Sequence, residues 1–169
     1  MTHAILEVLL LLLPAGVANT MPIFAARYNW LPGLNKPIDG GRGIVGDNKT
    51  VRGLIIGLLF GSIAGYIISL FDVYIYESSV FSLTLGALLG AGAIGGDMIK
   101  SFFKRRLRIS SGKPWRPFDQ IDYVIGALIV ALFFVSLTWQ QVMFAIILFG
   151  ALSFGVSYIG YTLNIKKSI

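Results

Sequence analysis

The stretch Gly95–Tyr123, GGDMIKSFFKRRLRISSGKPWRPFDQIDY, joins two hydrophobic segments of the chain through a basic loop. It leaves the first segment through Asp97 and enters the second through Asp119 and Asp122. Asp119 and Asp122 are three residues apart, so they share a face at the start of a helix. In the preceding helix, residues spaced three or four positions apart also share a face, and four residues follow this spacing: Asp97, Ser101, Lys104 and Arg108. Three carboxylates beside many cations at one membrane surface indicate polyphosphate chemistry with a divalent metal.

The composition is that of a membrane protein. Of 169 residues, 56% are hydrophobic and 13% charged, and the mean hydropathy is +0.78, whereas soluble domains carry about 25% charged residues. The chain has no cysteine and one histidine, which excludes a thiolate nucleophile, a cysteine metal site and a histidine cluster. The net charge of +6 does not predict nucleic-acid binding, because an apolar chain leaves little polar surface for it.

Five apolar runs predict an all-α membrane protein, with one domain over residues 1–169. The predicted spans are residues 4–26, 54–71, 80–103, 118–138 and 142–163. The two large loops are residues 27–53 and 104–117, and a tight turn is predicted at Trp139–Gln141. No Lys or Arg precedes the first apolar run, so we interpret it as a retained span rather than a signal peptide. Glycines four residues apart in the second span predict a close helix approach: Gly57, Gly61 and Gly65.

The cations are confined to alternate connections of this five-span chain. All 14 Lys and Arg residues fall in the first loop, in the stretch Lys100–Arg116, or at Lys166 and Lys167. The positive-inside rule then places the N-terminus outside the cell membrane, and both large loops and the C-terminus in the cytoplasm.

The carboxylates have two interpretations. Asp97 lies in an apolar span, where an ionised side chain costs roughly 2.5–3.5 kcal/mol, so it is either functional or ion-paired with Lys100 or Lys104. Asp119 and Asp122 could instead cap the next helix and compensate its dipole. Oxygen ligands with cations and glycines suit Mg²⁺, which is bound by carboxylates and substrate phosphates.

The first large loop carries a second candidate site, KPIDGGRGIVGDNKTVRG from Lys36 to Gly53. Its glycines, from Gly40 to Gly46, let the backbone approach a ligand and form an anion-binding nest; the alternative is a flexible tether. The stretch is not a P-loop. That motif requires a glycine directly before the Lys-Thr pair, whereas here Asn48 stands directly before Lys49.

Several motifs resemble those of a known superfamily. Gly96-Asp97 through Ser101 to Lys104-Arg105, followed by Asp119-x-x-Asp122, resembles the signature of CDP-diacylglycerol synthases. With the chain length and the motifs P-AG-V-AN-xx-P, K-P-I-D-x-G-R, G-D-x-K-T-x-R-G and P-W-x-x-x-D-Q-x-D, it resembles the archaeal branch, the CDP-archaeol synthase family. The larger enzymes carry a K-D pair where this chain has Lys113-Pro114-Trp115, so the metal ligand of that pair has no counterpart here.

The resemblance implies that CTP transfers cytidine monophosphate to a lipid phosphate, 2,3-bis-O-geranylgeranyl-glycerol 1-phosphate, with release of pyrophosphate. It implies Mg²⁺ on Asp97, Asp119 and Asp122. The implied catalytic residues are Asp97, Ser101, Lys104, Arg105, Asp119 and Asp122. The implied substrate-binding residues are Asn19, Asp39, Arg42, Gly46, Asp47, Lys49, Thr50, Arg52, Gly53 and Lys100.

Alternative functions remain open at this point. The lipid could be a diacyl phosphatidic acid rather than an isoprenoid ether lipid. A small lipid flippase or transporter would need polar residues along the membrane midplane, whereas here they cluster at the predicted cytoplasmic ends. A CDP-alcohol phosphotransferase would carry the motif D-G-x-x-A-R, which is absent. The preference between CTP and dCTP and the oligomeric state are not predicted.

Overall fold

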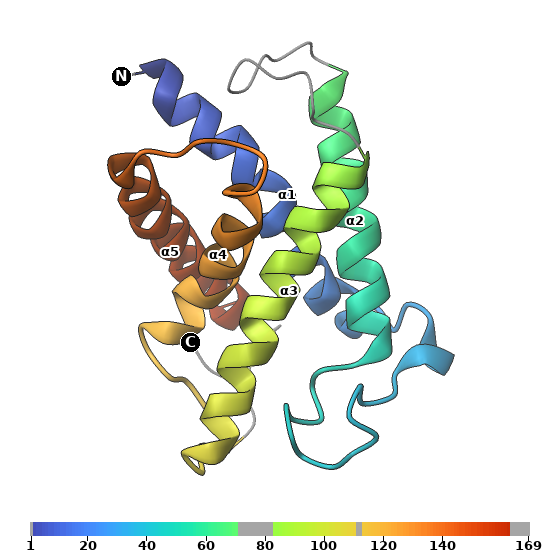
Figure 1. Ribbon diagram of the computed structural model, residues 1–169. Helices are drawn as coiled ribbons and strands as arrows, with labels where there is room; N and C mark the ends of the chain where they lie inside the picture. The colour runs from blue at the N-terminus through green and yellow to red at the C-terminus, as the bar shows by residue number, and fades with distance from the viewer. Residues whose placement is uncertain (1, 71–82, 111–112, 163–169) are drawn as a thin grey trace.

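The computed structural model describes residues 2–70, 83–110 and 113–162 and is all-helical over these ranges (Figure 1). Its elements are α1 (Thr2–Arg27), the 3₁₀ helix η1 (Pro32–Leu34), α2 (Val51–Ser69), α3 (Leu83–Arg106), α4 (Phe118–Ala131) and α5 (Trp139–Thr162). The described part holds no β-strand, only an isolated antiparallel bridge between Pro37 and Thr50. The all-α prediction is confirmed. Residues 72–79, which lie between the second and third predicted spans, and the C-terminal Lys166 and Lys167 are outside the described residues.

Three helices of the described ranges are long and apolar enough to cross a membrane. They are Ile5–Arg27 of α1, Val51–Ser69 of α2 and Trp139–Thr162 of α5. Helix α3 carries charged residues over its C-terminal half, and α4 has only 14 residues. The chain is therefore a helical membrane protein, and the count of five spans stays a prediction.

Glycines bring α2 against both of its neighbours at backbone distance. A Cβ atom added at Gly57 would lie 2.8 Å from the carbonyl oxygen of Ala18 in α1. A Cβ atom at Gly86 of α3 would lie 2.4 Å from the carbonyl oxygen of Gly61 in α2. Since real Cβ contacts are longer, only glycine permits these crossings, and the predicted close approach of this helix is confirmed.

A second glycine crossing joins α3 to α4 and fixes the position of the acidic residues. A Cβ atom at Gly126 would lie 2.1 Å from the carbonyl oxygen of Gly92, and one at Gly96 would lie 2.3 Å from that of Asp122. The backbones of the two helices therefore touch one residue before Asp97. This contact sets the carboxylates of the two helices side by side.

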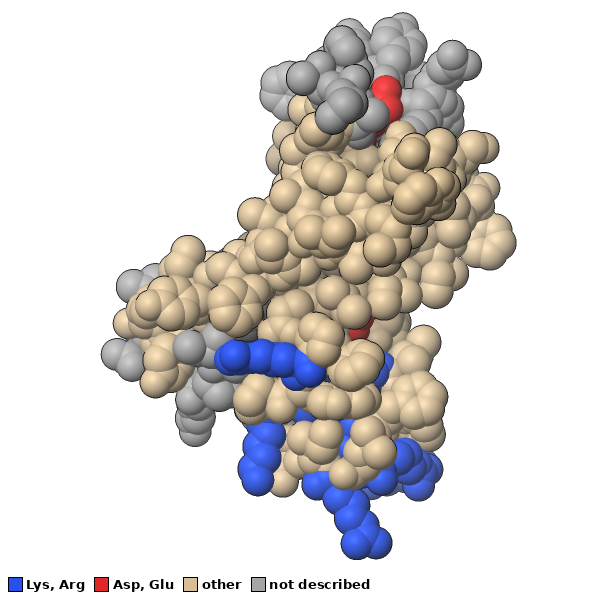
Figure 2. Space-filling model, turned by 90° about the vertical axis from the view of Figure 1, so that its left-hand side faces the viewer, with Lys and Arg blue, Asp and Glu red and all other residues tan. Residues whose placement is uncertain are grey.

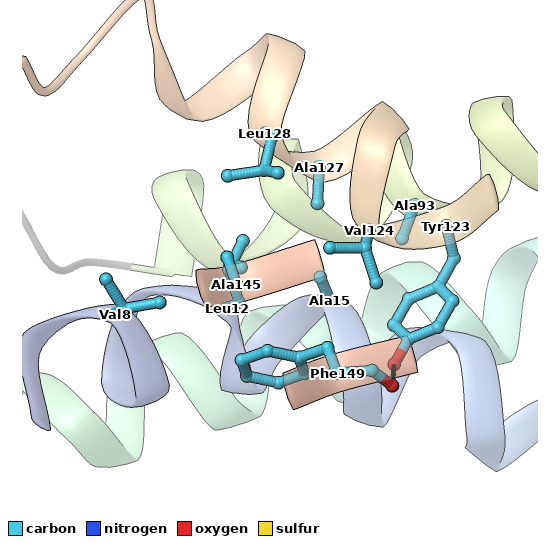
Figure 3. Close-up of a cluster of buried hydrophobic side chains, with 10 residues drawn as sticks. All are labelled: Val8, Leu12, Ala15, Ala93, Tyr123, Val124, Ala127, Leu128, Ala145 and Phe149. Carbon is cyan, nitrogen blue, oxygen red and sulfur yellow. Dashed lines mark hydrogen bonds between the residues drawn. The ribbon is translucent and has the colours of Figure 1, made fainter. Parts of the chain in front are cut away.

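The core lies where α1, α3, α4 and α5 meet (Figure 3). Its buried residues are Val8, Leu12, Ala15, Ala93, Tyr123, Val124, Ala127, Leu128, Ala145 and Phe149. The Tyr123 hydroxyl donates a 3.1 Å hydrogen bond to the carbonyl oxygen of Phe149, which ties α4 to α5. The N-terminal part of α4, which carries Asp119 and Asp122, is held by this core.

The junction of α4 and α5 differs from the prediction. Helix α4 ends at Ala131 rather than at residue 138, and α5 begins at Trp139, where a turn was predicted. The reason is a capping box, in which the first and fourth residues of T-x-x-Q satisfy each other's backbone donors. The Thr138 amide donates to Gln141 Oε1 at 2.9 Å, and the Gln141 amide donates to Thr138 Oγ1 at 3.4 Å.

The C-terminal end of α3 also differs from the prediction. The helix continues to Arg106, so Lys104 and Arg105 lie on the helix and not in the loop. Arg108 lies beyond the helix in a left-handed conformation, with φ of 58°. The prediction that Arg108 shares the helix face of Asp97 is therefore wrong.

The loop between α1 and α2 and the C-terminal end of α3 lie at the same end of the molecule, the lower end in Figure 1. Figure 2 shows that the Lys and Arg side chains visible on that face gather toward this end. This distribution matches the charge segregation that the sequence predicts.

Candidate active site

A cavity of about 530 Å³ lies at the basic end of the bundle, with walls from all five α-helices and from the end of the first loop. It is lined by most of the predicted site residues: Asn19, Lys49, Thr50, Gly53, Asp97, Lys100, Ser101, Lys104, Arg105, Asp119 and Asp122. The fold therefore gathers these predicted residues from four separate parts of the sequence around one space.

Lys100 stands at the centre of the charged residues. Its Nζ atom lies 3.2 Å from Asp97 Oδ1 and 2.6 Å from Asp119 Oδ1. The same Nζ lies 2.9 Å from Asp122 Oδ2, which receives no well-directed hydrogen bond from any described group. One oxygen of each carboxylate thus points at a single cation.

Two further lysines complete a charge-balanced cluster. Lys49, from the end of the first loop, pairs with Asp97 Oδ2. Lys104 donates to both oxygens of Asp119, at 3.1 and 3.0 Å. Lys49, Lys100 and Lys104 therefore balance the three aspartates. The interpretation of Asp97 as an ion-pair partner of Lys100 is confirmed. This pair belongs to a larger cluster of charged residues that lines the cavity.

The two aspartates of α4 are held by backbone donors as well as by lysines. The backbone amide of Trp115 donates to Asp119 Oδ2, and that of Tyr123 donates to Asp122 Oδ1 at 2.7 Å. These bonds orient both carboxylates toward α3. Neither bond is a helix cap at the N-cap position, which is Pro117 and makes no side-chain cap.

The glycine loop is organised by Asp39. The carboxylate accepts the amides of Gly41, Ile44 and Val45 at 3.0, 2.7 and 3.1 Å. The Val45 amide contributes most to holding the pKa of Asp39 below its ordinary value. Three amide groups of the expected anion nest thus already serve the carboxylate of Asp39. Binding of a ligand anion by the remaining amides of this loop stays a prediction.

Five predicted substrate-binding residues do not line the cavity: Asp39, Arg42, Gly46, Asp47 and Arg52. Arg52 is buried, and its Nη1 atom donates to Asn29 Oδ1 at 3.4 Å and to the carbonyl oxygen of Trp30 at 3.3 Å. It ties the start of α2 to the end of α1. Thr50 lines the cavity and also caps α2, since its Oγ1 accepts the Gly53 amide at 3.1 Å.

Comparison with known proteins identifies the family. The whole chain, residues 1–169, matches the family model described as CarS-like: CDP-archaeol synthase. This chain belongs to the CDP-archaeol synthase family. It is 39% identical over 160 residues to the CDP-archaeol synthase of Saccharolobus islandicus, covering 94% of this chain and 92% of that one. It is 35% identical over 162 residues to that of Thermococcus onnurineus, covering 92% and 91%.

A solved structure has the same fold. It is described as an intramembrane enzyme for archaeal membrane lipids biosynthesis, and it superposes with a TM-score of 0.77 at 32% identity. The match covers 91% of this chain and 94% of that chain. The fold of this CDP-archaeol synthase family member is thus shared along nearly its whole length.

The three carboxylates of this family member suit a divalent cation in two respects: they offer oxygen ligands, and they point toward one position. Oxygen ligands are those that Mg²⁺ prefers, and one oxygen from each aspartate already faces the Lys100 ammonium. Within the described ranges, no three acidic or histidine side chains lie together as a ready-made metal group. Magnesium on Asp97, Asp119 and Asp122 would therefore share these oxygens with Lys100 or replace its ammonium.

Five polar residues that line the cavity are not among the residues predicted from the sequence: Asn48, Lys113, Gln120, Ser153 and Ser157. Gln120 stands between the two aspartates of α4, it is buried, and its Oε1 has no partner among the described residues. Its place in the motif D-Q-x-D was a signal that could have been used. The two serines belong to α5, and nothing in that apolar run separates them from an ordinary helix face.

Proposed function

We propose that this chain is a CTP-dependent cytidylyltransferase that converts 2,3-bis-O-geranylgeranyl-glycerol 1-phosphate to CDP-archaeol within the membrane. The observation that carries the proposal is the convergence of Asp97, Asp119 and Asp122 on Lys100 inside a cavity of the basic end. Membership of the CDP-archaeol synthase family supports the substrate pair.

The reaction is an in-line displacement. A phosphate oxygen of the lipid attacks the α-phosphorus of CTP; the new P–O bond forms as the bond to the bridging oxygen breaks, and pyrophosphate leaves with that oxygen. No general base is required, because the attacking phosphate is already ionised. The main task of the protein is to hold two anions together in the correct direction.

The side chains of α3 bind and orient the phosphates. Lys104 and Arg105 line the cavity, and a guanidinium such as that of Arg105 can bind two phosphate oxygens at once. Ser101, on the same face of α3 as Lys104, donates a hydrogen bond to a phosphate oxygen. Lys49 and Thr50 bind the nucleotide from the opposite wall.

The charge balance of the cluster supports a role for a divalent metal. The ammonium groups of Lys49, Lys100 and Lys104 are already matched by three carboxylates. Binding a triphosphate and a lipid phosphate therefore requires additional positive charge beyond these lysines. Magnesium held by Asp97, Asp119 and Asp122 would supply that charge on the phosphate oxygens.

The same proposal includes the membrane topology. Five spans with the N-terminus outside would put the basic end of the bundle in the cytoplasm, where CTP is available. The lipid phosphate would lie at the same surface.

The test is a reaction with purified protein in detergent, Mg²⁺ and labelled CTP or dCTP. The lipid is either the geranylgeranyl ether phosphate or a diacyl phosphatidic acid, with mass detection of the product. We expect pyrophosphate release and CDP-archaeol, and faster turnover of the ether lipid. Asp119→Asn and Asp122→Asn should abolish turnover while the protein still inserts; near-normal transfer by both would remove their metal-binding role. Absence of pyrophosphate release from the wild-type protein would instead support a transporter.

A further inference from the structure

A second cavity lies between α3 and α4. It has a volume of about 520 Å³, and its walls are almost entirely apolar. The side chains that form them include Ile99, Phe103, Trp115, Phe118, Ile125 and Ile129. We call this cavity the α3–α4 groove.

The groove opens on a surface that is suited to the bilayer. Its side chains Ile99, Phe103 and Ile129 are 61%, 54% and 57% exposed. Exposed apolar side chains in such a row would be a liability in water, but they are expected where a helix faces lipid chains. In the five-span topology proposed above, the groove would open toward the membrane interior.

The groove meets the active-site cavity at an ion pair. Lys100 and Asp122 line both cavities, and their charged atoms lie 2.9 Å apart across the gap between α3 and α4. These two residues carry the only charged side chains among those that line the groove. An occupant that matches both surfaces must have apolar chains and an anionic head that reaches Lys100.

We propose that the apolar chains of the lipid phosphate substrate lie in the α3–α4 groove. The phosphate then meets Lys100 where the two cavities join, while CTP occupies the polar cavity. The inference rests on the proposed function, because it assigns a place to the lipid of that reaction. The competing route runs past α1 and α5, through the polar cavity itself, where Ile23 and Ser153 form part of the wall.

The glycines that line the groove differ in the space available for a side chain, and one of them can be substituted without a clash. Gly92, Gly96 and Gly126 are required for the α3–α4 crossing, since a Cβ atom at each would clash with backbone. A Cβ atom at Gly95 would meet nothing within 4 Å, although Gly95 lines the groove. A large side chain at position 95 therefore fills the groove without disturbing the helix crossing.

The kinetic test compares Gly95→Phe with Gly155→Phe. Gly155 is a matched control, because it is also partly exposed in a helix, it has nothing within 4 Å of its Cβ position, and it lines neither cavity. We expect Gly95→Phe to raise KM for the long-chain lipid phosphate by about tenfold or more, since excluding two methylene groups already costs about that factor. KM for CTP, and turnover of a short-chain dialkylglycerol phosphate, should equal those of the control. An unchanged KM for the long-chain lipid would overturn the proposal.

A labelling test separates failure of the groove from failure of the proposed function. A lipid phosphate with a diazirine in its chain is photolysed with wild-type protein without CTP, and the labelled peptides are compared with those from the same lipid lacking the phosphate. We expect phosphate-dependent labelling of α3 and α4 peptides, reduced in Gly95→Phe. Phosphate-dependent labelling of α1 or α5 alone would assign the lipid to the competing route, whether or not turnover occurs. If Gly95→Phe also loses short-chain turnover, this labelling decides the assignment.

Discussion

Replacing Lys100 by Met removes the cation on which three carboxylates converge. The substitution keeps the length of the side chain and leaves the apolar part of its contacts in place. Asp97, Asp119 and Asp122 would then face one another with only Lys49 and Lys104 to balance them. We expect this variant to be less stable than the wild-type protein when no divalent cation is present.

The magnitude follows from the three contacts of Lys100. At 2.6, 2.9 and 3.2 Å, each attraction is about 5 to 6 kcal/mol before desolvation, with an effective dielectric constant near 20. Desolvation of the ions offsets most of that sum, and breaking a buried pair typically costs about 3–5 kcal/mol. Because 14% of the Lys100 side chain remains exposed, we expect about 3 kcal/mol. For a chain of this length, that corresponds to a fall in Tm of about 6–12 °C.

The assay is thermal unfolding in detergent, with and without Mg²⁺. The control is Lys36→Met, which removes the same charge from an exposed position that lines neither cavity and should leave Tm unchanged. Since the cluster of Lys100→Met carries an excess negative charge, Mg²⁺ should raise its Tm more than it raises that of the wild-type protein. If Lys100→Met unfolds at the wild-type temperature without metal, the cluster contributes no net stability and the reasoning is wrong.

Three further variants test separate parts of the structure. Gly86→Ala should lower the free energy of unfolding by about 1–3 kcal/mol, because its Cβ would press on the carbonyl oxygen of Gly61; thermal unfolding measures this. Asp39→Ala should speed hydrogen exchange of the amides that its carboxylate holds and raise KM for CTP. Because the pKa of Asp39 is lowered from 3.8, its contribution is fully present above about that pH and is lost only as pH falls through the lowered pKa, so neutral-pH activity should not titrate with it. Tyr123→Phe should cost about 1 kcal/mol, because it removes the buried hydrogen bond to the carbonyl oxygen of Phe149.

The helices were predictable where local chemistry determines them. Glycines four residues apart predicted the close packing of α2, because such spacing puts every missing side chain on one face. The start of α5 was also encoded, in the capping box from Thr138 to Gln141, but the apolar run around it concealed the boundary. The end of α3 could not be read from the pattern, since the basic residues of its last turn suit a helix end and a loop equally well.

The acidic and basic residues that the candidate site takes from α3 and α4 were predictable from the sequence. The contribution of the loop between α1 and α2 was less predictable. The spacing of Asp97 and Lys104 on one helix, and of Asp119 and Asp122 on the next, predicted residues that the structure does bring together. The role of Asp39 required the three-dimensional path of the loop, because its partners are amides whose direction depends on backbone conformation.

The position of the cluster where α3 crosses α4 supports the proposal that it serves both a water-soluble and a lipid substrate. The crossing at Gly96 brings the backbone of α3 against that of Asp122. The ion pair of Lys100 and Asp122 lies at this crossing and lines both cavities. In the proposed arrangement, a phosphate on a lipid chain and a phosphate on a nucleotide would approach this ammonium from opposite sides. A side chain at position 96 would push α3 and α4 apart, because its Cβ would lie 2.3 Å from the carbonyl oxygen of Asp122, and it would thereby separate the carboxylates.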